Sequence, residues 1–148
     1  MKQRIFSFTL ITISLLFWFM GVSQAATKTV TADAAGIVTI SVSDLSTTAR
    51  YWEFSDGATK IRFFAVLGTN GSVRVAFDAC EVCGGRLGYE QKGKDIECRV
   101  CGRVFRIDEI GSKNRTYGCW PSYLPFTEKG KSIVIRAVDL RKGSGLFN

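Results

Sequence analysis

The sequence contains no histidine, and this absence excludes more chemistry than any other feature of the composition. Without imidazole the chain has no Ser-His-Asp triad, no Cys-His dyad, no His-ligated haem and no Cys₂His₂ zinc site. Its two methionines, Met1 and Met20, lie near the N-terminus, so the remainder also lacks the ligands of Met/His copper carriers and of His-ligated blue-copper centres. Soft-ligand chemistry therefore depends on the five cysteines.

Long basic runs with interleaved aromatic residues are also missing, although the net charge is +7. We therefore expect no nucleic-acid partner. The apolar fraction of 46% and the charged fraction of 22% are those of an ordinary globular chain, and 148 residues are enough for one domain.

The N-terminus has the layout of an export signal. Lys2 and Arg4 precede the uncharged segment Ile5–Val22, and Ser23-Gln24-Ala25 offers small residues for a signal peptidase. The apolar segment is also long enough to span a bilayer, so an uncleaved membrane anchor is the alternative to cleavage after Ala25. We expect residues 1–25 to form this leader helix and residues 26–148 to form one exported domain, in the periplasm or on the outer face of the cytoplasmic membrane.

Beyond the leader, short runs of alternating, β-branched residues predict strands. Asp56-Gly57 predicts a hairpin and Thr69-Asn70-Gly71 a further turn, so the middle of the chain should be an antiparallel meander. No convincing 3.6-residue apolar stripe occurs, and helix is expected only in the leader and in brief turns such as 139–142. The predicted class is all-β: a small antiparallel sheet or barrel, with strands expected at 36–42, 50–54, 60–66, 72–77 and 131–140, the first and last as neighbours.

Four cysteines form two C-x-x-C-G units at positions 80–84 and 98–102. A two-residue gap lets both thiolates of one tight turn reach the same ion, and the following glycine permits a positive φ. The linker contains the turn 92–95, which fits the hairpin of a rubredoxin-like or zinc-ribbon-like knuckle insert. The spacing predicts a metal site made by Cys80, Cys83, Cys98 and Cys101, within a knuckle region spanning 78–121.

Two other states of these cysteines compete with a metal site. An oxidising compartment favours disulfides, either within each C-x-x-C unit or between the units, and free thiols are the third state. A redox-active C-x-x-C pair prefers a helix N-terminus, whereas β turns are expected after both pairs here.

Cys119 stands apart, between Gly118 and Trp120. An unpaired thiol in an exported chain is either a fifth ligand, a substitute for one of the four, or a buried apolar residue packed on Trp120. The Gly before it and Pro121 after it predict a shaped loop.

Spacing does not distinguish iron from zinc. A closed Cys₄ zinc site is structural, whereas iron in the same cage passes single electrons. Arg86, Arg99 and Arg103 flank the knuckles, either offsetting thiolate charge or lying as ordinary solvated surface. No carboxylate pair has a spacing that forces a second, oxygen-ligated site.

The ordered set of motifs in this chain resembles the FtrD-like membrane iron-sulfur protein family. The resemblance runs from about Arg50 to Phe147 and includes all five cysteines; its motifs are 61–66, 73–83, Gly88-Tyr89, 98–102, Phe105, Ile110-Gly111 and Gly118-Cys119 with Pro121. One departure is clear. The family's last cysteine is preceded by Gly-Gly and followed by Asn-Pro, where this chain has Tyr117-Gly118-Cys119-Trp120-Pro121.

The resemblance implies a periplasm-facing, membrane-associated component of a high-affinity iron uptake system. It further implies an iron or iron-sulfur centre, with zinc as the alternative, and a membrane iron permease or a redox protein as partner. A non-enzymatic electron-transfer or metal-handling role is expected. The alternatives are an interaction module pinned by structural zinc, which partners a permease, and a thiol-disulfide protein.

Overall fold

The computed structural model describes residues 26–113 and 118–148. The predicted leader, its cleavage site and the possible anchor therefore lie outside the described residues. In the described ranges, no helix has both the length and the apolar character that crossing a membrane requires.

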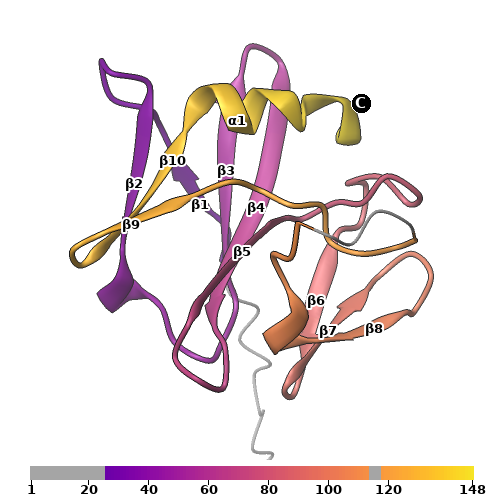
Figure 1. The fold of residues 1–148 in the computed structure, drawn as a ribbon. Helices are drawn as coiled ribbons and strands as arrows, with labels where there is room; N and C mark the ends of the chain where they lie inside the picture. The colour runs from indigo at the N-terminus through magenta and orange to yellow at the C-terminus, as the bar shows by residue number, and fades with distance from the viewer. Residues whose placement is uncertain (1–25, 114–117) are drawn as a thin grey trace, which may run out of the picture.

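The all-β class is confirmed, as three small sheets in the described part of the chain (Figure 1). The strand orders are β1-β3-β4-β5, β2-β10-β9 and β6-β7-β8. The bounds are β1 Lys28–Val30, β2 Ile37–Ser41, β3 Arg50–Asp56, β4 Thr59–Leu67, β5 Val73–Phe77, β6 Tyr89–Lys92, β7 Asp95–Cys98, β8 Val104–Arg106, β9 Thr127–Lys129 and β10 Ser132–Arg136, with helix α1 Ala137–Lys142 and 3₁₀ turns Val42–Asp44, Ile107–Glu109 and Ser144–Leu146.

The four-stranded sheet contains the predicted meander. β3 and β4 pair antiparallel around Gly57, whose φ of 59° suits the two-residue turn, and β4 pairs antiparallel with β5. The short strand β1 pairs parallel to β3, which no local pattern predicted.

The predicted pairing of the first and last strands is also confirmed, because β10 lies antiparallel to β2 with Ile133 opposite Ile40. The expectation of a strand through residue 140 was wrong, since β10 ends at Arg136 and α1 follows. Asp139 is only 2% exposed. Its carboxylate forms ion pairs with Nε of Arg136 at 2.7 Å and with Nζ of Lys142 at 2.8 Å, and each of these residues is three positions away along the chain. A helical turn makes these two pairings possible.

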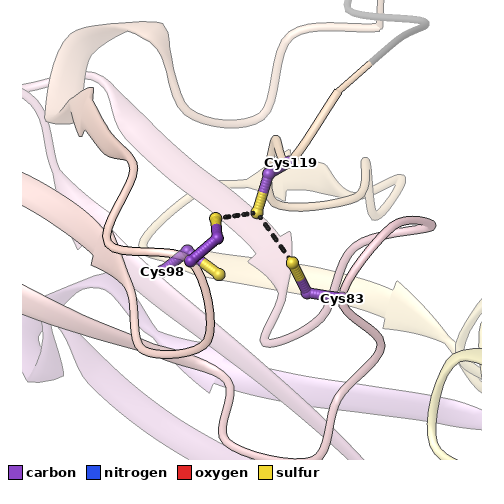
Figure 2. Close-up of side chains that lie close together, drawn as sticks. Cys83, Cys98 and Cys119 are labelled. Carbon is purple, nitrogen blue, oxygen red and sulfur yellow. Dashed lines mark hydrogen bonds between the residues drawn. The ribbon is translucent and has the colours of Figure 1, made fainter.

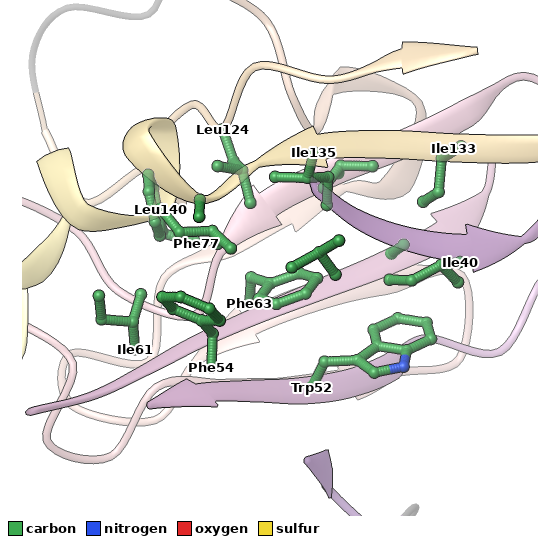
Figure 3. Close-up of a cluster of buried hydrophobic side chains, with 14 of the residues drawn as sticks. Ile40, Trp52, Phe54, Ile61, Phe63, Phe77, Leu124, Ile133, Ile135 and Leu140 are labelled. Carbon is green, nitrogen blue, oxygen red and sulfur yellow. The ribbon is translucent and has the colours of Figure 1, made fainter. Parts of the chain in front are cut away.

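β4 is buried on both faces and divides the interior into two hydrophobic clusters. Ile61, Phe63 and Ala65 face the cluster beneath the β2-β10-β9 sheet, whereas Phe64 and Val66 face the cysteine side. Successive strand residues point to opposite faces, which accounts for this division. Figure 3 shows side chains from β3, β4, β5, β10 and α1 meeting in the first cluster.

The predicted knuckle insert is the third sheet, which lies beside the meander in Figure 1. β6 and β7 form the expected hairpin, with Gly93 at a φ of 62° in its turn. Ile96 and Phe105 project from this sheet into the second cluster. The insert is therefore attached to the meander by a core of its own, next to the cysteines.

Candidate metal centre

The two C-x-x-C-G units fold into the same turn. The Gly84 N–H donates to the carbonyl of Cys80 at 2.8 Å, and the Gly102 N–H donates to the carbonyl of Cys98 at the same distance. Both glycines have positive φ values, 66° and 70°. The glycine that ends each motif thus closes a tight turn that side-chain-bearing residues rarely adopt.

Cys119 reaches the knuckles because the segment after it pairs with the end of β5. The Ser122 N–H donates to the carbonyl of Ala79 at 2.8 Å, and its own carbonyl accepts from the Phe77 N–H at 2.9 Å. Ala79 directly precedes Cys80, so this pairing places Cys119 beside the first knuckle. Tyr89 adds a second attachment, since its hydroxyl donates to the Cys119 carbonyl at 2.8 Å.

All five thiols converge around Cys119. The Sγ atom of Cys119 lies 3.1 Å from that of Cys101, 3.3 Å from that of Cys83 and 3.5 Å from that of Cys80. Figure 2 shows Cys83, Cys98 and Cys119 approaching one another from three different segments. The sulfurs of Cys83, Cys98, Cys101 and Cys119 all lie within 4.8 Å of one another.

These separations fit one ion in a four-sulfur cage. Tetrahedral bonds of about 2.3 Å place the sulfurs about 3.8 Å apart, within the range that the four thiols span. In a [4Fe–4S] cluster each thiolate binds a different iron, so the sulfurs lie further apart than when they share one ion. The five cysteines are free, and 3.1 Å is longer than a disulfide bond of about 2.05 Å.

The site is buried on one side and open on the other. Cys80, Cys98 and Cys119 are buried, Cys83 is half-buried and Cys101 is exposed. An ion held by these thiols would therefore lie near the surface, at the side marked by Cys101.

Hydrogen bonds among the thiols set which of them ionises first. The side-chain hydrogen bond between Cys101 and Cys119, followed by one from the Arg103 N–H, lowers the pKa of Cys101 to about 7. Burial opposes ionisation of Cys80, but its hydrogen bonds with the Cys83 N–H, Tyr89 and Cys119 outweigh burial and lower the pKa of that thiol. Burial raises the pKa of Cys119. Cys101, which is both exposed and has a lowered pKa, can therefore offer a thiolate to a metal ion near neutral pH, because metals bind the deprotonated form.

A buried carboxylate supports the first knuckle. Asp78 accepts the Tyr89 N–H at 2.6 Å and lies 3.2 Å from Nε of Arg62. Arg62 also donates to the carbonyl of Gly85, which follows the knuckle. Burial raises the pKa of Asp78 to about 6. A Cβ on Gly88 would lie 2.3 Å from this carboxylate, so the approach requires glycine.

The structure brings together all five predicted cysteines, but the four that lie closest together are not the four of the two C-x-x-C units. The spacing suggested a cage of Cys80, Cys83, Cys98 and Cys101, with Cys119 as a fifth ligand or a substitute. The mutually close set instead contains Cys119, and Cys80 lies at its edge. The supporting roles of Asp78 and Arg62 were missed, because no local pattern connects β4 with the residue that precedes a knuckle by two positions.

The flanking arginines are exposed. Arg99 donates through Nη1 to the carbonyl of Leu87 at 3.4 Å, and Arg103 supplies its backbone N–H to Cys101. Arg99 and Arg103 thus make hydrogen bonds within the knuckle region.

The fold and the sulfur cluster define an all-β protein with a candidate cysteine-held metal centre. The chain belongs to the family described as membrane iron-sulfur containing protein FtrD-like, whose profile matches residues 42–147. Neither the search of curated proteins nor that of solved structures gave a match. Family membership and the cysteine cluster together fit a metal-binding, iron-related protein.

Proposed function

We propose that this chain is an exported protein that holds a single iron ion through four cysteines and passes single electrons in an iron uptake system facing the periplasm. The observation that carries the proposal is the set of four thiol sulfurs lying within 4.8 Å of one another at an open edge of the protein. A four-sulfur set suits iron or zinc, and the family supports iron.

The chain's own residues have separate parts in this function. Cys83, Cys98, Cys101 and Cys119 would hold the ion, which when bound as iron supplies one-electron redox chemistry. The Cys83 N–H donates to the sulfur of Cys80 at 3.1 Å, so Cys80 is already hydrogen-bonded within its own turn. Such N–H-to-sulfur bonds stabilise thiolate charge and adjust the affinity and potential of a bound metal.

Anaerobic purification of the full chain tests the identity of the metal. We expect about one iron per chain, a ferric paramagnetic resonance signal, and visible absorption that bleaches on reduction. A colourless protein with stoichiometric zinc would instead support the structural-zinc interaction module. Two closed disulfides without metal, found by mass spectrometry without reductant, would support a thiol-disulfide protein.

A matched pair of variants tests the ligand set. Cys119→Ser should lower iron retention more than tenfold, because it removes the sulfur at the centre of the cluster. Cys80→Ser should retain iron, because its sulfur lies at the edge of the set. The reverse outcome would assign the cage to the two C-x-x-C units alone.

Export and the partner belong to the same proposal. The leader-like segment at 1–25 and the family description support delivery across, or attachment to, a membrane. A reporter fused after Asn148 should be active only outside the cytoplasm, and N-terminal sequencing of the purified chain should distinguish cleavage after Ala25 from an anchor. A membrane iron permease or a redox protein is the proposed partner.

A further inference from the structure

The open edge of the cysteine site is surrounded by exposed apolar side chains and arginines. Val82 is 69% exposed, Val100 44% and Leu87 42%. The exposed charged residues on these loops include three arginines. We use the name knuckle patch for the set Val82, Leu87, Val100, Arg86, Arg99 and Arg103.

Contacts between the two loops make the patch continuous. Val82 and Val100 occupy the same position in the two knuckles, directly before Cys83 and Cys101, whose sulfurs both contact Cys119. The Arg99 N–H donates to the carbonyl of Gly88 at 3.0 Å, and its side chain donates to the carbonyl of Leu87. The segment after the first knuckle therefore lies against the second knuckle.

Exposed apolar residues are concentrated in this part of the described chain. Of the five large hydrophobic residues that are exposed there, four lie between positions 82 and 104 and only Val138 lies elsewhere. Single exposed apolar residues are ordinary, whereas a group rimmed by charge is typical of an interaction surface. The group includes Val100, which directly precedes Cys101, the one exposed thiol among the five.

The charge of the rim indicates the kind of partner. Three arginines stand on the knuckle loops against one carboxylate, Glu81, whereas Glu90, Asp95 and Glu97 lie on the β6-β7 hairpin. We propose that the knuckle patch docks an acidic one-electron redox protein, with Val82, Leu87 and Val100 at the centre of the contact and the arginines at its rim. This inference rests on the proposed function, because it assigns the patch to the same cysteine site.

A protein partner suits the patch better than an anionic membrane surface. Electron transfer slows steeply with distance, so the edge that exposes Cys101 must face another redox centre. Among the described residues, the large hydrophobic side chains exposed in this region are Val and Leu, not the Trp, Tyr or Phe that favour the membrane interface. Arginine charges at a rim speed the encounter with an acidic surface and make it depend on salt.

Binding of the full chain to a plant-type ferredoxin, a small acidic one-electron protein, tests the inference by biolayer interferometry at low ionic strength. Arg86→Glu/Arg99→Glu/Arg103→Glu should weaken binding at least tenfold. The matched control, Lys28→Glu/Lys129→Glu/Lys131→Glu, makes the same charge change at exposed sites on other sheets and should weaken it less than threefold. Val82→Ser/Val100→Ser should weaken it at least threefold.

Circular dichroism and metal content establish that each variant is folded. If the triple arginine variant is not folded, Arg86→Glu alone replaces it, since Arg86 lies outside both C-x-x-C turns, and should weaken binding at least threefold. A tenfold rise in salt should weaken wild-type binding at least tenfold and the arginine variant much less.

Three results would overturn the inference: no binding of ferredoxin, equal weakening by the arginine and lysine variants, or arginine-dependent binding to phosphatidylglycerol vesicles but not to ferredoxin. A chain that contains iron yet fails these tests refutes the docking surface alone. A chain that contains no iron refutes the proposed function, whatever it binds.

Discussion

The two faces of the β1-β3-β4-β5 sheet are stabilised by different chemistry. On one face, Phe63 and its neighbours form a cluster of aliphatic and aromatic side chains beneath the β2-β10-β9 sheet (Figure 3). On the other, Phe64 packs in a cluster that includes Cys80, Cys98, Cys119 and the aromatic ring of Tyr89. The first face needs only apolar burial, whereas the second depends on the state of its sulfurs.

This difference predicts unequal responses to solution conditions. Burying a protonated thiol requires little free energy, whereas burying a thiolate is strongly unfavourable unless a cation or hydrogen bonds compensate its charge. A bound metal ion would supply that compensation and connect three segments of the chain. The cysteine half, which is the second cluster with strands β6–β8, should therefore depend on the ion for most of its stability. The apolar half, which is the first cluster with the β2-β10-β9 sheet, should not depend on it.

Removal of the metal should have the largest effect, and only on the cysteine half. We expect amide protection in β6–β8 to fall by about ten-thousandfold or more, because bound metal stabilises the fold that presents its ligands. Protection in β2 and β10 should change little. Hydrogen exchange with and without chelator measures both, and equal loss in the two halves would contradict the comparison.

Phe63→Ala should destabilise the whole domain by about 3–5 kcal/mol, since it leaves a cavity at a fully buried position. The loss should be the same with and without metal. Phe64→Ala, on the opposite face of the same strand, should cost less once the metal is removed, because its surroundings are already loosened. Denaturant unfolding of both variants in both states tests this coupling.

Asp78→Asn should change how stability depends on pH. Burial raises the pKa of this carboxyl to about 6, above the unfolded value of 3.8, so the folded state binds the proton more tightly. The stability that the protonated Asp78 carboxyl contributes to the fold is fully present below pH 4 and is lost as the pH rises through 6. Between pH 4 and pH 7, the free energy of unfolding of Asp78→Asn should therefore rise by about 3 kcal/mol relative to that of the wild type.

Unfolding curves of the wild type and Asp78→Asn across this range measure the difference. Asp56→Asn is a suitable control, because Asp56 makes an exposed ion pair with Arg141. A constant difference between Asp78→Asn and wild type across the range would contradict the raised pKa.

The smallest effect is expected at the surface of the meander. Glu53→Gln removes an ion pair with Lys60 at 3.0 Å, in which the lysine side chain is 69% exposed. Stability should change by less than about 1 kcal/mol, because water and salt screen such pairs. A larger loss by thermal unfolding would show that this ion pair contributes more than its exposure indicates.

The sequence predicted features set by local chemistry. Alternation gave the meander, Asp56-Gly57 its hairpin, and each C-x-x-C-G spacing its turn. The pairing of β2 with β10 was also anticipated, from the similarity of two apolar runs. The family resemblance is confirmed by the match over residues 42–147.

Features set by distant contacts were not predictable in the same way. The central place of Cys119 depends on Ser122 pairing with Phe77 and Ala79, which the separation along the chain conceals. The expected helical turn at 139–142 lies within α1, but the helix begins at Ala137, where a strand was expected, because Asp139 pairs with Arg136 and Lys142 on a helical turn. The first outcome is decided by tertiary partners that no local window contains, whereas the second depends on charged neighbours three residues away on either side of Asp139. The division of residues 1–25 from 26–148 stays a prediction.

Because β4 is buried on both faces, neither face tolerates a change in which side chains it presents. Because Phe63 and Phe64 belong to separate interiors, inserting or deleting one residue there would exchange the occupants of the two. The charged side chain of Arg62 would then face the apolar cluster instead of pairing with Asp78, and Ile61 would turn toward the cysteine side. Changes in chain length should thus be tolerated in the hairpin turns on either side of β4, and not within it.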